Sequence, residues 1–312
     1  MMEALLQKLE QEKLEHRQNV PLAPYTTFKI GGPCPVMILP HSGRETALAV
    51  SLCREADVPF LFLGSGSNVL VSDRGFPGAV ILFQRNFAEI SLLDGTTVYA
   101  QAGASLMRVC AFARDHGLAG LEFAYGIPAS VGGAVYMNAG AYGGEIRDVL
   151  AYADYLEEDG TAARRDNAAL DFSYRHSFFT GRALPVLGAA FSLRPGDPET
   201  IRREMDEIYA RRKEKQPLEY PSAGSTFKRP DGAYAAQLIE ECGLKGLQVG
   251  GAQVSEKHSG FLINRGGATC RDVLELIRRV QETVREKTGF SLEREVRLIG
   301  PAEEKGETEW KC

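Results

Sequence analysis

Two loops rich in glycine and serine are the parts of this chain best suited to chemistry. The first, Gly64-Ser65-Gly66-Ser67-Asn68, lies between two apolar runs, 59–63 and 69–71. Glycines let a backbone approach a ligand closely, and successive N–H groups can form a concave site for phosphate oxygens. A plain hairpin turn between two strands is the alternative interpretation.

This first loop differs from the glycine fingerprint of dinucleotide-binding folds. The third glycine is missing, because Val69 follows Asn68, and the residues after the loop predict a strand where the fingerprint requires a helix.

The second loop spans residues 126–140 and reads GIPASVGGAVYMNAG. Small side chains at this density allow a flat ring or a diphosphate to lie against the backbone. A tightly packed helix crossing would also explain them. Two such loops in one lobe favour a large cofactor that carries several phosphates.

The elements that must position these loops follow from apolar periodicity and from breaker residues. Helices are predicted at 1–16, 44–56, 106–116, 198–215, 234–241 and 271–286. Strands are predicted at 59–63, 69–71, 79–83, 90–93, 98–101, 151–157, 185–193, 225–228, 261–264 and 295–299. Short strands and helices without a regular alternation indicate an α+β fold, and we expect the domain boundary near the helix that Asp197 and Pro198 begin.

Charge and cysteine content exclude several classes of function. The net charge is −5 over 312 residues, with basic and acidic residues interleaved, so nucleic acid is not an expected partner. Six scattered cysteines include no CxxC pair, which argues against a metal site or a disulfide framework and favours the cytoplasm. No window approaches the roughly 20 apolar residues of a spanning helix, so we expect a soluble protein without membrane insertion.

The two loops belong to an ordered set of motifs that covers nearly the whole chain. The set resembles the UDP-N-acetylenolpyruvoylglucosamine reductase (MurB) family. The motifs that carry this resemblance are YTTFKIGG at 25–32, LGSGSNVL at 63–70, GIPASVGGAVYMNAGAYG at 126–143, YRHS at 174–177, AGSTFK at 223–228 and LEREVRLIG at 292–300.

The resemblance implies an FAD-binding domain of the PCMH (vanillyl-alcohol-oxidase-like) type, followed by a C-terminal α+β substrate-binding domain. We expect the FAD domain at 1–210, in subdomains of about 1–85 and 86–210, the substrate domain at 211–302, and a polar tail at 303–312. NADPH is the implied hydride donor. The first loop lacks the histidine that tethers flavin in some relatives of this fold, so noncovalent FAD is expected. A helix follows residue 197 directly, which matches the shorter variety of the family, without its extra tyrosine loop.

The implied reaction reduces the enolpyruvyl group of UDP-N-acetylglucosamine enolpyruvate to give UDP-N-acetylmuramate for peptidoglycan synthesis. Hydride from flavin N5 reaches the terminal methylene carbon, negative charge develops on the carboxylate, and a proton reaches the adjacent carbon. By resemblance, Ser225 donates this proton, while Arg175 and Glu295 stabilise the carboxylate. Without the resemblance, Ser225 would be an ordinary turn residue and Arg175 a surface ion-pair residue.

The remaining candidate residues bind cofactor or nucleotide. FAD contacts are expected from Gly64, Ser65, Gly66, Ser67, Asn68, Gly126, Ser130, Val131, Gly132, Gly133, Asn138 and Gly140. The UDP diphosphate has three candidate ligands, each of which could equally be a solvated surface residue: Lys215, Arg229 and Lys245. Two other functions stay open: another FAD-dependent oxidoreductase of this fold, or a nucleotide-sugar binding protein without catalytic activity.

Overall fold

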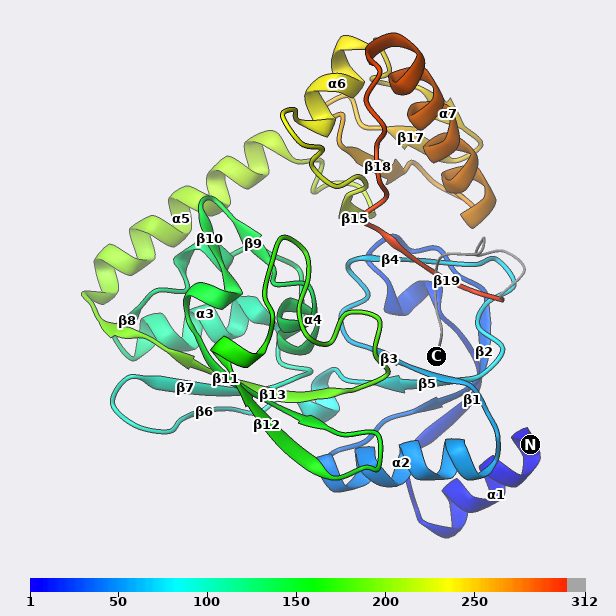
Figure 1. Cartoon of the computed structure of the whole chain (residues 1–312), viewed down its shortest axis with the longest axis vertical. Helices are drawn as coiled ribbons and strands as arrows, with labels where there is room; N and C mark the ends of the chain where they lie inside the picture. Colours follow the sequence, from blue (N-terminus) through cyan, green and yellow to red (C-terminus); the bar gives the residue numbers. More distant parts are fainter. Residues whose placement is uncertain (302–312) are drawn as a thin grey trace.

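The first part of the chain is a small sheet with two helices on one side (Figure 1). Residues 1–301 of a computed structural model are described. The strands of this first sheet, in the order β1-β2-β5-β3, are β1 (His16–Pro21), β2 (Pro33–Ile38), β5 (Ala79–Leu82) and β3 (Phe60–Leu63). The helices are α1 (Met2–Gln11) and α2 (Gly43–Glu55), and Ser42 caps α2 by accepting a hydrogen bond from Glu45 N. Leu5 and Leu9 of α1 are fully buried in the core shared with α2.

The second part is a five-stranded antiparallel sheet, with α3 and α4 packed into its core. Its strands, in the order β12-β11-β13-β7-β6, are β12 (Ala162–Asp166), β11 (Leu150–Leu156), β13 (Val186–Ser192), β7 (Thr97–Gln101) and β6 (Ile90–Leu92). The helices are α3 (Leu106–Asp115) and the short α4 (Val131–Tyr136). Short strand pairs complete it: β8 (Leu118–Ala119) with β14 (Arg194–Pro195), and β9 (Gly140–Ala141) with β10 (Gly144–Glu145).

The third part is reached through α5 (Pro198–Lys215), which runs along one side of the second part (Figure 1). Its sheet, in the order β15-β18-β17-β16, contains β15 (Ser222–Ser225), β18 (Phe261–Asn264), β17 (Ala252–Val254) and β16 (Gln248–Val249). Two helices pack with this sheet, α6 (Ala235–Glu241) and α7 (Cys270–Thr288). A reciprocal cap between Thr269 and Asp272 begins α7, and Gly289 ends it in the left-handed conformation.

The end of the described chain returns to the first part. Strand β19 (Arg297–Ile299) pairs in parallel with β4 (Val69–Val71), which directly follows the first glycine loop. The Asp73 carboxylate also accepts hydrogen bonds from Cys270 N at 2.8 Å and Arg271 N at 3.2 Å, at the start of α7. The third part is therefore fixed to the first by a strand pair and by a helix cap.

Most predicted elements are present, and the differences have local causes. The first helix ends at Gln11 and not at residue 16, since Lys13 takes a left-handed conformation (φ 57°) and β1 then begins. The sequence did not predict helix α4 or strands β1, β2, β8, β9, β10, β12, β14, β16 and β17. The predicted strand at 225–228 is β15 at 222–225, and the last strand starts at Arg297.

The remaining expectations from the sequence concern the first glycine loop, the domain limits, the polar tail and membrane-spanning helices. The first glycine loop is not a hairpin turn, because β3 pairs with β5 whereas β4 pairs with β19. The predicted domain limit at residue 210 lies within α5. The predicted polar tail, 303–312, lies outside the described residues. Across residues 1–301, each helix is too short or too polar to pass through a bilayer.

Candidate active site

The two glycine loops lie against each other. A Cβ atom at position 64 would lie 2.1 Å from Ser130 Oγ, so only glycine lets the first loop approach the second this closely. Ser130 caps α4 and accepts a hydrogen bond from Gly133 N at 3.4 Å. The sequence therefore brings two separate small-residue segments into direct contact, as expected if both bind a single large ligand.

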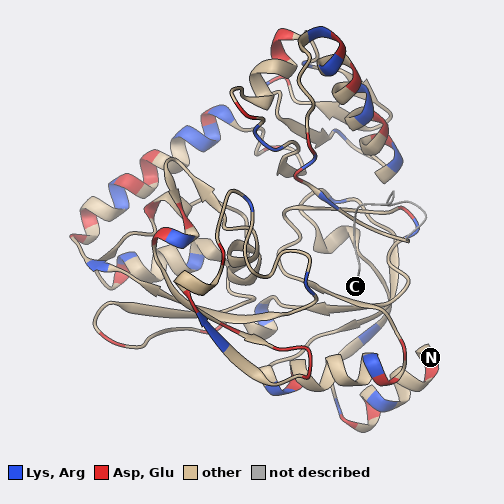
Figure 2. Cartoon of the chain, viewed as in Figure 1, with Lys and Arg blue, Asp and Glu red and all other residues tan. Residues whose placement is uncertain are grey.

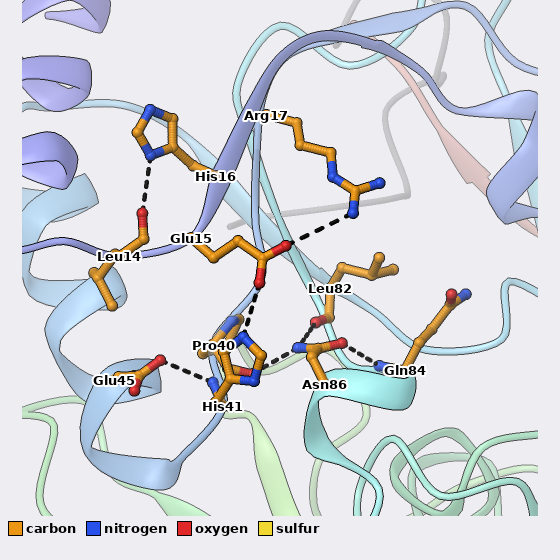
Figure 3. A network of polar contacts seen from close by, with 10 residues as sticks. All are labelled: Leu14, Glu15, His16, Arg17, Pro40, His41, Glu45, Leu82, Gln84 and Asn86. Atoms are coloured by element: carbon orange, nitrogen blue, oxygen red, sulfur yellow. Dashed lines mark hydrogen bonds and ion pairs between the residues drawn. The ribbon is translucent and has the colours of Figure 1, made fainter.

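A polar network around Gln84 and Asn86 holds the base of the first loop, and Figure 3 shows these two residues with Pro40 and Leu82. Gln84 Nε2 donates to the Gly64 carbonyl at 3.2 Å, and its backbone N–H donates to Asn86 Oδ1. Asn86 Nδ2 in turn donates to the carbonyls of Pro40 at 2.6 Å and Leu82 at 3.0 Å. These bonds tie the loop to β5 and to the segment that enters α2.

Arg175 lies in a tight turn with an unusual backbone conformation. Ser173 and His176 exchange two backbone hydrogen bonds of 3.2 Å, and Arg175 takes φ 55°. Left-handed φ values are uncommon for residues other than glycine and persist where surrounding contacts enforce them. The buried Asn138 supplies one such contact, because its Nδ2 donates to the Ser173 carbonyl at 3.1 Å.

Arg175 and Glu295 form an ion pair that is largely shielded from solvent. Arg175 Nε donates to Glu295 Oε1 at 2.8 Å, and the side chains are 22% and 11% exposed. Burial raises the pKa of Glu295, while Arg175 and, more weakly, Lys228 oppose the shift. The structure thus brings two of the three predicted catalytic residues into direct contact.

Ser225 is the third predicted catalytic residue, and backbone pairing of the segment after it places it near Glu295. Ser225 ends β15, and the next three residues pair with residues 293–295. Glu295 N donates to the Thr226 carbonyl at 2.8 Å, and Lys228 N donates to the Glu293 carbonyl at 2.8 Å. The half-buried Ser225 is therefore the immediate neighbour of the residue bonded to Glu295.

Both glycine loops reach this cluster of predicted catalytic residues. Asn68 Nδ2, from the first loop, donates to the Glu295 carbonyl at 3.3 Å and contacts Met137 Sδ at 3.7 Å. Arg175 Nη2 lies 3.5 Å from the carbonyl of Gly140, at the end of the second loop. The loops expected to bind a cofactor and the residues expected to act on a substrate thus share one location.

The predicted FAD-binding residues differ in their solvent exposure and in the hydrogen bonds that their side chains make within the protein. Half-buried positions on the loops are Gly64, Ser65, Ser67, Asn68, Gly126, Gly132 and Gly140, and Gly133 is exposed. Gly66, Ser130 and Val131 are buried. Asn138 is also buried, and its side chain is bonded to Glu145 and to Arg147 N as well as to Ser173. The structure gives Asn138 a role in holding the Arg175 turn.

The three predicted UDP ligands lie around the third part of the chain. Lys215 is exposed at the end of α5, and Lys245 pairs with Glu240 at 2.6 Å. The Arg229 guanidinium lies 3.9 Å from the ring centre of Tyr234. Tyr234 and Glu240 both line a hollow beside α6, so Arg229 and Lys245 lie near the same hollow.

The sequence interpretation missed Tyr174 and Tyr234. Both are large, half-exposed aromatic residues, at 51% and 56%. Tyr174 Oη accepts a hydrogen bond from Arg229 N at 3.3 Å, and the Arg175 guanidinium lies 5.1 Å from its ring centre. Tyr174 directly precedes Arg175 and begins the YRHS motif at 174–177, which was the signal for an aromatic residue here.

Comparisons with known proteins agree with this geometry. Residues 216–299 match the family described as the C-terminal domain of UDP-N-acetylenolpyruvoylglucosamine reductase, and residues 34–165 match an FAD binding domain family. The chain is 47% identical over 293 residues to UDP-N-acetylenolpyruvoylglucosamine reductase of Clostridium novyi, covering 94% of this chain and 95% of that protein. The enzyme of the same name from Caldanaerobacter subterraneus is 46% identical over 304 residues, covering 96% of this chain and 99% of the relative.

Solved structures show the same relationship. The crystal structure of UDP-N-acetylenolpyruvylglucosamine reductase (MurB) from Thermus caldophilus superposes on this chain with a TM-score of 0.77 and 37% sequence identity. The match covers 92% of this chain and 99% of the Thermus caldophilus chain. A variant of berberine bridge enzyme, described as a reticuline dehydrogenase, matches 62% of this chain and 44% of its own, with a TM-score of 0.51 and 17% identity. The second likeness concerns the fold alone. The expected α+β architecture with a PCMH-type FAD-binding domain is confirmed.

Proposed function

The chain belongs to the UDP-N-acetylenolpyruvoylglucosamine reductase family and is an FAD-dependent oxidoreductase, and we propose that it reduces UDP-N-acetylglucosamine enolpyruvate to UDP-N-acetylmuramate with NADPH. The observation that carries the proposal is the shielded Arg175–Glu295 ion pair, which lies beside Ser225 and touches both glycine loops. An arginine–glutamate pair that lies near a serine and contacts both glycine loops fits reduction of an unsaturated carboxylate.

The glycine loops fit FAD by an observation independent of the comparisons. Gly64 packs against the Ser130 side chain where no further side chain could fit, so the two loops meet at one place, as binding of a single large cofactor by both requires. We assign FAD binding to these loops within residues 1–210, and substrate binding to residues 211–302. The first loop offers serine and asparagine, and no histidine, so noncovalent binding is proposed. Bound FAD would accept a hydride from NADPH and supply it to the substrate.

Arg175 is proposed to stabilise the substrate carboxylate. Its Nε is engaged by Glu295 and its Nη2 contacts the Gly140 carbonyl, which together fix the plane of the guanidinium, and its remaining N–H groups are proposed to meet a second carboxylate. The raised pKa of Glu295 suits a group that shares a proton with a carboxylate as its charge increases. Ser225 is proposed to deliver the proton to carbon, with its acidity supplied by this polar surrounding.

The nucleotide end of the substrate is proposed to bind the third part of the chain. Arg229, held against Tyr234, and Lys245 supply positive charge there, and Lys215 adds a further cation. Diphosphate oxygens would replace Glu240 as the partner of Lys245. We place the reaction in the cytoplasm, where nucleotide-linked precursors and NADPH are both present.

The decisive experiment measures NADPH oxidation by the purified, FAD-loaded protein with and without the UDP-enolpyruvyl sugar under anaerobic conditions. The proposal expects NADPH to bleach the flavin once, and the sugar to restore its colour in stoichiometric amount. A flavin that NADPH bleaches and that only oxygen reoxidises would identify another reductase of this fold and refute the proposal.

A further inference from the structure

Arg212 occupies the inner face of α5, where an apolar residue would be expected. The other buried residues of this helix are Ile201 and Met205, which share that face at helical spacing. The flanking cations Arg211 and Lys213 are exposed, in the basic last turns of the helix that Figure 2 shows in blue. Arg212 itself is only 6% exposed. Arginine is almost never buried to this degree unless it is paired.

The protein gives Arg212 little compensation for its burial. Nη1 lies 3.4 Å from Gln216 Oε1, and the guanidinium lies 5.4 Å from the ring centre of Tyr142. Nε is buried without a hydrogen-bond partner in the part of the chain that the structure describes. Burial lowers the pKa of Arg212, yet an arginine keeps its charge at neutral pH. A buried cation without an anionic partner indicates that a ligand completes the site.

The beginning of the second glycine loop and the residues just after its end lie beside this cation. At Gly126 (φ 87°), a Cβ atom would lie 2.8 Å from Arg212 Cδ and 3.4 Å from its Nε. Tyr142, which the guanidinium faces, lies two residues beyond Gly140, and the Gly140 carbonyl contacts the proposed catalytic Arg175. Arg212 is thus held between Gly126, where the second glycine loop begins, and Tyr142, just beyond its end.

We propose that the Arg212 guanidinium is the counter-charge of the bound flavin ring and favours its reduced state, in which the ring carries more electron density. Cations beside the flavin pyrimidine edge tune reduction potentials in this way. The inference rests on the proposed FAD site, and it assigns a tuning role to a residue outside the glycine motifs. A planar, weakly hydrated guanidinium suits such a buried, delocalised partner better than an ammonium group would.

The test is the midpoint potential of bound FAD, measured by anaerobic equilibrium titration against a reference dye, without NADPH or UDP-sugar. Arg212→Met should shift the two-electron equilibrium at least about tenfold toward oxidised FAD, which lowers the potential by roughly 30 mV. Arg211→Met, which removes an exposed cation one residue away, is the matched control and should leave the potential unchanged.

An unchanged potential in an FAD-loaded Arg212→Met protein would overturn the proposal. So would equal losses of affinity for oxidised and reduced FAD, because that pattern places the guanidinium at the diphosphate. If Arg212→Met does not hold FAD, Arg212→Gln decides by the same titration. This titration contains no UDP-sugar. A midpoint potential that depends on Arg212 would therefore support the inference even if the proposed substrate reaction failed.

Discussion

Arg175 Nε donates to Glu295 Oε1 across 2.8 Å, although the two residues are 120 positions apart in the chain. The contact joins a turn of the second part to the segment that leads into β19. Both side chains are mostly shielded, at 22% and 11% exposure, so the pair is neither a surface ion pair nor a fully buried one. Removing one partner leaves a poorly solvated charge on the other.

Arg175→Lys keeps the charge and loses the planar fork that can hold Glu295 and a substrate carboxylate together. Turnover should fall by at least about tenfold, which corresponds to roughly 1.4 kcal/mol of barrier. Arg164→Lys is the control, because Arg164 holds Asp154 through two nitrogens on the distant strand β12. Wild-type turnover in an FAD-loaded Arg175→Lys protein would refute the role.

Glu295 predicts a pH dependence of stability. Burial raises its folded-state pKa above the unfolded value, so the folded chain binds this proton more tightly. The stabilisation is present below the unfolded pKa, about 4.3, and is lost as the pH rises through the folded pKa. In thermal melts, the stability of wild type relative to Glu295→Gln should therefore decrease with rising pH. Glu293→Gln, at a 71% exposed carboxylate, is the control. A relative stability that rises with pH would contradict the assignment.

FAD should be released without covalent linkage. The first loop carries Ser65, Ser67 and Asn68, and no histidine that could form a flavin bond. Precipitation with acid should leave all yellow chromophore in the supernatant, as absorbance measures. Colour that stays with the washed precipitate would contradict this prediction.

Asp73 should contribute to stability by capping α7 from the first part of the chain. Its carboxylate receives two backbone N–H groups, at 2.8 and 3.2 Å. Asp73→Ala should lower the free energy of unfolding by about 1 kcal/mol, and Asp73→Asn by less, because the amide oxygen can still accept. Urea titration measures both, and equal stability of Asp73→Ala and wild type would contradict the capping role.

The sequence predicted elements whose pattern is local. The apolar spacing of α7 and the Asp197 cap of α5 identified those helices within a few residues. The first helix was extended too far because Leu14 continues the apolar spacing, although the backbone reverses at Lys13. Strand β1 was missed because most of its residues are polar and exposed, and β2 because Pro33 and Pro35 fall within it.

The candidate site depended on contacts that no local pattern encodes. The parallel pairing of β19 with β4 brings Glu295 to Asn68, and the left-handed turn at Arg175 completes the ion pair. Family motifs singled out the three catalytic candidates, yet neither periodicity nor spacing indicated that they would meet. Arg212 was not identified either, since its burial depends on how α5 lies against the second glycine loop.

Anaerobic stopped-flow of Ser225→Ala tests the central claim most directly, because it separates the two halves of the reaction. Reduction of the flavin by NADPH needs no proton donor to carbon, so bleaching should proceed at close to the wild-type rate. Reoxidation by the UDP-enolpyruvyl sugar should be slowed by at least about a hundredfold, because the transition state loses its acid. Ser222→Ala, at the other end of β15, is the matched control and should be normal in both halves. Equal slowing of both halves, or of neither, would contradict the account.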